Sequence, residues 1–133
     1  MKLLRYLLPL LLLQAAAYAQ PGKIVISEPG EARMKLTESK YDFGTLPEGK
    51  MGTHIFEFTN TGTASLIIEK VQTPCSCTSP TYSTEPVAPG AKGTITIQFN
   101  SSGKPGPFSK TVSVIYNSEQ SPELITIEGV VLR

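Results

Sequence analysis

The sequence predicts an all-β protein, an antiparallel β-sandwich built from six to eight short strands. Apolar and polar residues alternate in short runs that are rich in β-branched and aromatic side chains. After residue 19, no segment places apolar residues at helical spacing over ten or more positions. The eleven glycines and eleven prolines are spread along the chain rather than gathered in one block. We therefore expect two sheets, each with an apolar inner face and a solvated outer face.

Six runs carry this alternation, and each aligns its apolar residues on one side. In chain order, the aligned residues are Ile24 and Ile26 in 23–28, Met34 and Leu36 in 34–37, His54, Phe56 and Phe58 in 54–59, Ile95, Ile97 and Phe99 in 94–100, Val112, Val114 and Tyr116 in 110–116, and Ile125 and Ile127 in 124–131. A further run, Leu66 to Ile68 continued by Val71, is apolar on both sides, so its facing is not predicted.

Turn residues separate these runs. Residues 60–63, Asn-Thr-Gly-Thr, lie between two strand patterns and predict a tight hairpin in which Gly62 takes a positive φ. Further breaks follow at 86–90, 103–107 and 117–122. Short strands with frequent turns are typical of a β-sandwich.

The first 19 residues have the composition of a secretory signal peptide, 1–19. Two basic residues precede an apolar run, and the triplet Ala-Tyr-Ala at 17–19 fits the small-x-small cleavage pattern. Cleavage after Ala19 predicts an exported protein, either periplasmic or extracellular. The apolar run is shorter than the roughly 20 residues that span a bilayer, so we expect no membrane span after cleavage. Residues 20–35 then form an N-terminal arm or an edge strand, and residues 36–133 form the sandwich domain.

The charge pattern gives no sign of a nucleic-acid or membrane-surface partner. Twelve Lys and Arg residues are balanced by eleven Asp and Glu residues, for a formal net charge of +1. The charges are scattered as on an ordinary solvated surface, without a run of one sign. We therefore expect neither nucleic-acid binding nor attachment through a polybasic patch.

The only two cysteines, Cys75 and Cys77, lie between two prolines in the stretch "TPCSCTSP". In an extended strand their Cα atoms would be roughly 6.6 Å apart, near the upper end of the disulfide range, so a bond between them needs a local kink. Such a bond encloses one residue, so it restricts the unfolded chain only slightly and adds little stability. Four interpretations stay open: a packed structural pair, a redox pair, a Cu(I) site, or an intermolecular bridge.

The single histidine and the single aspartate are weak candidates for chemistry. His54 is in phase with Phe56, which predicts a partly buried, hydrogen-bonded side chain. We predict no metal site. The alternative is a site formed by Cys75, Cys77 and His54, which is the one imidazole in the sequence. In "YDFG", Phe43 is predicted to pack in the core, with the following glycine letting the chain turn. Hydrolytic catalysis needs a base held against a nucleophile, and no motif here places one.

Several motifs occur together in a recognisable order: "YDFG" before an acidic-Gly turn, then "FEFTNTG", then "CSCT". This order resembles the exported bacterial family catalogued as domain of unknown function 1573, over about residues 36–131. The resemblance implies an immunoglobulin-like sandwich of about seven to eight strands, related to PapD and ciliary-adhesion domains, without an established catalytic activity. The family has no agreed functional residues, so only the positions of Cys75, Cys77 and Thr78 carry over.

These observations predict a non-enzymatic exported module that binds or scaffolds in the bacterial envelope and needs no cofactor. The expected partner is another envelope protein or surface component, met through a sheet edge or the loops between strands. The alternative function is a thiol-based redox or Cu(I)-handling protein that works through Cys75 and Cys77.

Overall fold

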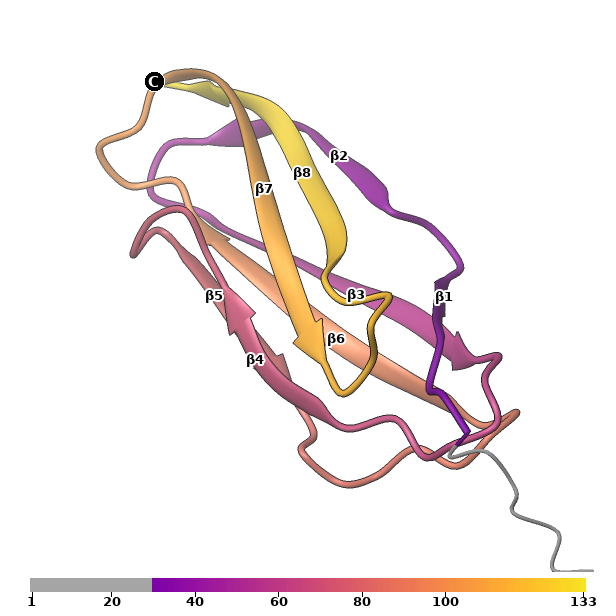
Figure 1. Ribbon diagram of the computed structural model, residues 1–133. Helices are drawn as coiled ribbons and strands as arrows, with labels where there is room; N and C mark the ends of the chain where they lie inside the picture. Colours follow the sequence, from indigo (N-terminus) through magenta and orange to yellow (C-terminus); the bar gives the residue numbers. More distant parts are fainter. Residues whose placement is uncertain (1–29) are drawn as a thin grey trace, which may run out of the picture.

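A computed structural model describes residues 30–133, which form two four-stranded sheets packed face to face (Figure 1). The predictions for the signal peptide at 1–19, for cleavage after Ala19 and for a strand at 23–28 lie outside the described residues. Within residues 30–133, the structure contains no helix of the length and apolarity needed to cross a membrane.

Each sheet draws its strands from distant parts of the chain. Sheet 1 is antiparallel throughout and has the order β1 (Met34–Leu36), β3 (Met51–Asn60), β6 (Lys92–Asn100) and β5 (Thr78–Tyr82). Sheet 2 has the order β2 (Lys40–Pro47), β8 (Glu123–Leu132), β7 (Gly106–Tyr116) and β4 (Ile68–Gln72). Its one parallel pair is β2 with β8. The predicted all-β, immunoglobulin-like sandwich of seven to eight strands is confirmed. It differs from a purely antiparallel sandwich in that edge strand β2 pairs with β8 in parallel.

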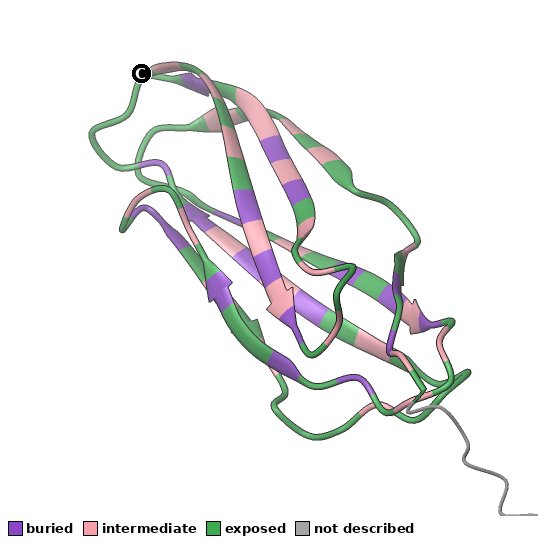
Figure 2. Ribbon diagram, viewed as in Figure 1, coloured by how far each residue is buried: buried purple, intermediate pink, exposed green. Residues whose placement is uncertain are grey.

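The core lies between the two sheets and follows the period-two pattern. The residues predicted to face inward on four strands are all buried (Figure 2): Phe56, Phe58, Ile95, Ile97, Phe99, Val112, Val114, Tyr116, Ile125 and Ile127. Because each strand alternates its side chains between the two faces, one period is enough to assign the core face of β3, β6, β7 and β8.

Two strands were missed in the sequence. The "YDFG" segment is part of β2 and does not form a turn: Phe43 is half-buried against the core, and Gly44 takes φ 67° at a bulge between Asp42 and Thr45. The bulge breaks the alternation and hides the strand. Strand β5 contains Pro80, which is compatible with an edge strand because the outer side of the strand requires no N–H donor.

The hairpin predicted at residues 60–63 is wrong. Strand β3 pairs with β1 and β6, whereas the next strand, β4, lies in the other sheet, so this segment crosses between sheets. Gly62 does not have a positive φ. It is needed for a different reason: a Cβ at this position would clash with the Glu31 carbonyl and lie 2.7 Å from the Arg33 nitrogen. The glycine permits close approach of the backbone that leads into β1.

Residues just before β1 belong to the sandwich. Ala32 and Met34 are buried in the core, and the Arg33 carbonyl accepts a hydrogen bond from Thr61 N at 2.9 Å. The domain boundary predicted at residue 36 therefore falls inside edge strand β1.

Tyr116 ties β1 to the core, and its ionisation should limit stability at high pH. Its buried hydroxyl accepts a hydrogen bond from Met34 N at 3.4 Å. Burial raises the pKa of Tyr116 above its ordinary 10.0. Since the unfolded chain ionises this group first, the stability that it contributes is present below pH 10 and is lost as pH rises through the folded pKa.

We therefore expect the free energy of unfolding to fall above about pH 10 more steeply in the wild type than in Tyr116→Phe. At neutral pH the free energy of unfolding of the variant should be lower than that of the wild type by about 1 kcal/mol, the value of one hydrogen bond. Urea unfolding between pH 7 and 11 measures both effects. Identical pH slopes for the two proteins would contradict the assignment.

Candidate functional site

One end of the sandwich gathers three connections around the cysteines (Figure 1), and we call it the disulfide end. It consists of the β4–β5 turn (73–77), the β2–β3 turn (48–50) and the β6–β7 loop (101–105). Asn100 N donates to the Cys77 carbonyl at 2.8 Å. The fully buried Ser101 donates its hydroxyl to the Lys50 carbonyl at 2.6 Å, which links the other two connections.

Cys75 and Cys77 are joined by a disulfide in the turn where the chain leaves sheet 2 for sheet 1. Their Cα atoms are 5.2 Å apart, closer than in an extended strand, because Thr78 N donates to the Cys75 carbonyl at 3.3 Å and the backbone turns. Cys77 is 8% exposed and packs in the core, whereas Cys75 is half-buried. The buried Thr78 hydroxyl lies 3.8 Å from the Cys75 sulfur and 3.7 Å from the Cys77 sulfur.

Reduction of this bond should cost little stability. A loop that encloses one residue limits the unfolded chain only slightly, by about 1.5 kcal/mol against about 3 kcal/mol for a 15-residue loop. We expect a thiol reductant to lower the free energy of unfolding by about that amount, and the Cys75→Ser/Cys77→Ser variant to show no response to reductant. Urea unfolding with and without reductant measures the difference. Loss of the fold on reduction would show that the bond does more than restrict the chain.

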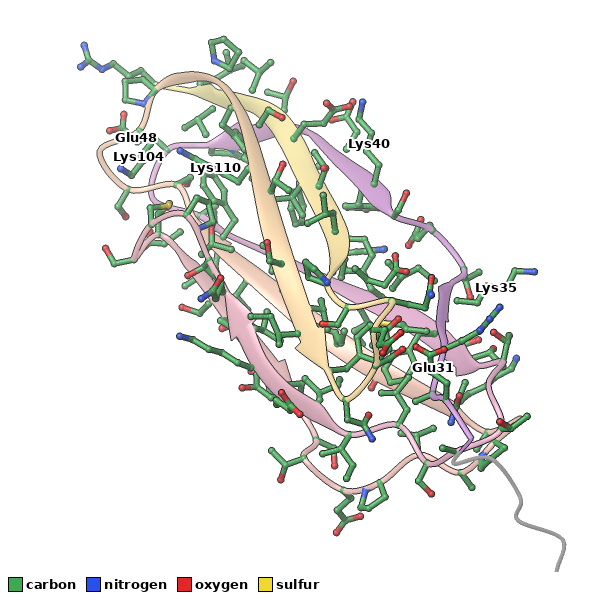
Figure 3. The ribbon with its side chains drawn as sticks, in the orientation of Figure 1. Glu31, Lys35, Lys40, Glu48, Lys104 and Lys110 are labelled. Atoms are coloured by element: carbon green, nitrogen blue, oxygen red, sulfur yellow. A yellow bond between two sulfur atoms is a disulfide. The ribbon has the colours of Figure 1, made fainter. Side chains whose placement is uncertain are left out.

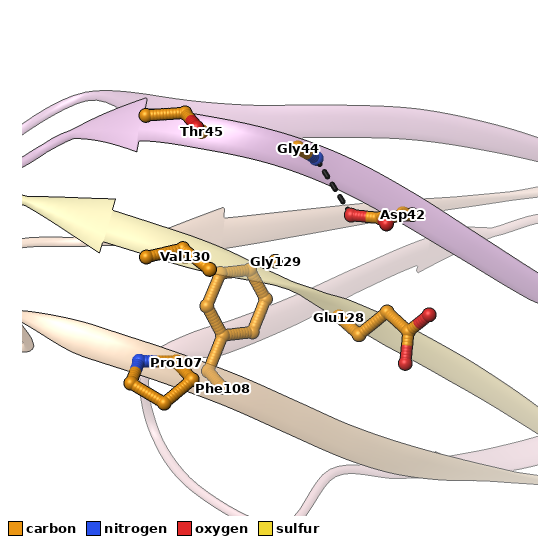
Figure 4. A pocket seen from close by; sticks show the side chains of 8 residues that line it. All are labelled: Asp42, Gly44, Thr45, Pro107, Phe108, Glu128, Gly129 and Val130. Carbon is orange, nitrogen blue, oxygen red and sulfur yellow. Dashed lines mark hydrogen bonds between the residues drawn. The ribbon is translucent and has the colours of Figure 1, made fainter.

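Beside this end, a shallow hollow opens over β2, β8 and β7 (Figure 4). Gly129 shapes it, because a Cβ there would lie 2.8 Å from the Gly44 carbonyl and 2.9 Å from the Phe108 ring. The Phe108 ring stacks on Phe99 of sheet 1 with centroids 4.0 Å apart, which closes the core. The residues around the hollow are Asp42, Gly44, Thr45, Pro107, Phe108, Glu128, Gly129 and Val130.

The carboxylates of this hollow already have partners. Asp42 accepts a hydrogen bond from Gly44 N at 2.7 Å, and Glu128 pairs with Lys40 at 3.3 Å. Each carboxylate therefore supports the local backbone or an ion pair and is not directed at a second reactive group.

His54 fills the seam on the β2–β3 side of the sandwich. Its ring stacks on Tyr41 with centroids 3.5 Å apart, meets Phe56 edge-on, and bonds through Nε2 to the Glu38 carboxylate. The side chain is 21% exposed. Among residues 30–133, no three His, Cys, Asp or Glu side chains gather to hold a metal ion. His54 contacts Tyr41 and Glu38, whereas Cys75 and Cys77 are bonded to each other.

Lys110 is not singled out by the sequence patterns above. It occupies an inward-facing position of β7, two residues from the half-buried Phe108 and two from the fully buried Val112. The alternation that aligned Val112 and Val114 would have found it, had the period been extended one step towards the N-terminus. Lys110 is half-buried and has no carboxylate within ion-pair distance in the described part of the chain.

Solved structures share this sandwich. A protein of unknown function from Porphyromonas gingivalis matches 74% of this chain at TM-score 0.64 and 18% identity, and the match covers 46% of that protein. The PapD-like domain of human CEP192 matches 77% of this chain and 87% of that domain at TM-score 0.64 and 10% identity. The Vibrio cholerae VesB protease matches 77% of this chain and 32% of that protein at TM-score 0.57 and 11% identity.

Identities this low show the fold alone, and the chain spans less than half of the Porphyromonas protein, 46% of its length. No curated protein sequence matches the chain. The model of one family, described as a protein of unknown function (DUF1573), matches residues 34–131, from the start of β1 almost to the end of β8. This match includes the disulfide turn and confirms the resemblance carried by "CSCT". The chain belongs to the DUF1573 family.

Proposed function

We propose that this chain is a non-enzymatic, exported module that binds or scaffolds a partner in the bacterial envelope. The observation that carries the proposal is the half-covered strand β7, whose first half has no strand neighbour on the side of β4 among residues 30–133. An uncovered strand offers a row of backbone donors and acceptors to another chain. The partner is another envelope protein or surface component, met at this edge or at the adjoining loops.

The side chains that carry chemistry in other proteins support the fold of this one. The cysteines are bonded to each other, His54 is stacked and paired, and Asp42 caps a bulge. Tyr116 has a raised pKa because it is buried, and its hydroxyl anchors β1. These contacts favour binding over catalysis.

Export is supported by the N-terminal sequence and by the cysteine chemistry. The basic start, the apolar run and the Ala-Tyr-Ala triplet ending at Ala19 have the order that signal peptidase recognises. A disulfide persists in oxidising compartments such as the periplasm. The mature protein should therefore begin at Gln20, which intact mass measurement of the native protein tests.

Site-directed photo-crosslinking in living cells tests the binding function. A photoreactive residue replaces Lys104 at the disulfide end in the full chain, and Glu119 at the opposite end serves as the matched exposed control. We expect a discrete adduct from position 104 that untagged chain competes away, and none from position 119. Equal labelling from both positions, or no adduct from any exposed loop, would count against the proposal.

A further inference from the structure

Within residues 30–133, the edge of β7 that faces the β4 side is unpaired from Gly106 to Val112, and we call it the open edge. Strand β7 pairs with β8 from Gly106 to Val114, but with β4 only from Ser113 to Tyr116. Strand β4 ends at Gln72, and the chain then turns away from β7 and crosses to sheet 1 through the disulfide turn. No other backbone segment among residues 30–133 forms hydrogen bonds with residues 107–112 on that side.

Two hydrogen bonds show which backbone groups face outward along this edge. Asn117 directly follows β7, and its N–H group donates to the Ile67 carbonyl at 3.2 Å. Because backbone groups alternate in direction along a strand, the N–H and C=O groups of odd-numbered residues in β7 face the β4 side. Thr126 N donates to the Ser39 carbonyl at 2.8 Å, away from its cross-strand partner Thr111, so that pair does not exchange hydrogen bonds. Both observations place the N–H and C=O groups of Ser109 and Thr111 on the open side.

We propose that this edge binds an extended segment of a partner protein that carries a carboxylate opposite Lys110; the inference rests on the proposed binding function and specifies its partner. An added strand continues sheet 2 through backbone hydrogen bonds, and its alternate side chains face the gap between the sheets. Lys110 points to that same side at the rim of the core. An ammonium group in this half-buried position is stabilised by an opposite charge across the strand pair.

The surrounding charges favour an acidic segment. Lys50 and Lys104 lie in the turn and loop of the disulfide end, and neither forms an ion pair within residues 30–133. Figure 3 shows Lys104 and Lys110 at the same end of the molecule as Glu48. Glu48 pairs with Arg133 at 3.8 Å, so lysines remain in excess around the open edge.

A second copy of this chain fits the edge poorly. Antiparallel pairing of two β7 edges about their middle would bring one Lys110 close to the other, and like charges across a strand pair are destabilising. The other sheet edges among residues 30–133 are irregular or short: β5 contains Pro80, β4 is bulged between Ile68 and Lys70, β2 is bulged between Asp42 and Thr45, and β1 has three residues. The occupant is therefore a different chain, and it binds at β7.

Two synthetic peptides test this inference on the full protein. The probe is acetyl-Thr-Val-Thr-Glu-Thr-Val-Thr-amide, and the control peptide has Lys in place of Glu. Amide hydrogen exchange followed by NMR reads out which edge is covered, and NMR titration gives the affinities. Two variants carry the same charge reversal: Lys110→Glu at the edge, and Lys35→Glu on β1 at a distance from it (Figure 3).

We expect the Glu peptide to bind at least about tenfold more tightly than the Lys peptide at low salt, with protection of the Ser109 and Thr111 amides. Lys110→Glu should reverse the preference, whereas Lys35→Glu should leave it unchanged. Equal binding of both peptides, absence of protection at millimolar peptide, or protection of β4 or β5 instead would overturn the inference. Protection of the same amides by raised protein concentration alone would identify a second copy and also overturn it. If the peptides fail while position 104 still crosslinks, the binding function stands and this inference alone falls.

Discussion

Replacing Asn60 with alanine is expected to lower the free energy of unfolding by about 4 kcal/mol, at about 1 kcal/mol for each hydrogen bond lost. Asn60 is 0% exposed at the end of β3, and its side chain makes four hydrogen bonds. The carbonyl oxygen accepts from Arg33 N at 3.2 Å and Gly62 N at 3.0 Å. The amide nitrogen donates to the carbonyls of Ala64 at 2.8 Å and Val87 at 2.9 Å.

These four bonds join the approach to β1, the β3–β4 crossover and the loop before β6 at the end opposite the disulfide. Alanine would remove these partners from part-buried backbone groups, of which the Val87 carbonyl keeps its bond from Leu66 N at 2.9 Å. Urea unfolding of the variant gives the change. The matched control is Asn117→Ala, which removes two hydrogen bonds from an exposed asparagine and should cost under about 1 kcal/mol. Equal losses in the two variants would show that burial at Asn60 does not matter.

Truncating Phe58 to alanine should also cost about 4 kcal/mol, in the range for a fully buried phenylalanine. Phe58 is 1% exposed, and its ring lies over its cross-strand partner Gly93, where a Cβ would come within 2.8 Å of a ring carbon. The substitution removes the ring and uncovers the Gly93 backbone. Both effects leave a cavity that the rigid sheet cannot close.

The control for Phe58 is on the same strand. Ile55 is 58% exposed on the outer face of β3, and Ile55→Ala should change the free energy of unfolding by no more than about 0.5 kcal/mol. Thermal and urea unfolding of the two variants measure the contrast. Similar losses would mean that the inward face of β3 has been assigned incorrectly.

The core was predictable because side-chain direction alternates strictly along a strand. Phe56 and Ile97 could be placed in the interior from their spacing alone, and the structure buries both fully. Strand β2 was not predictable in this way, because the bulge at Gly44 interrupts the period. The mistaken hairpin has another cause: Gly62 was interpreted through its conformational freedom, whereas its role is to let the Glu31 backbone approach, a contact between segments that local patterns do not encode.

The candidate site was predictable only in part. The sequence singled out Cys75 and Cys77 and the need for a kink between them, but not that this turn carries the chain from one sheet to the other. That crossover uncovers β7. The length over which β4 accompanies β7 depends on where β4 ends relative to a strand some 40 positions later in the chain, and one sequence does not state that register. The binding role proposed for Lys110 depends on this register, because β4 pairs with β7 only from Ser113 to Tyr116 and leaves the edge beside Lys110 unpaired.

The position of β8 has a mechanical consequence. This strand is the last one in residues 30–133, yet it lies inside sheet 2 between β2 and β7, parallel to one and antiparallel to the other. Tension applied at Leu132 along β8 must shear two ladders of hydrogen bonds together and cannot peel them open one at a time. A tether attached there should hold under load better than one attached through the short edge strand β1, and single-molecule pulling from the two attachment points would compare their rupture forces.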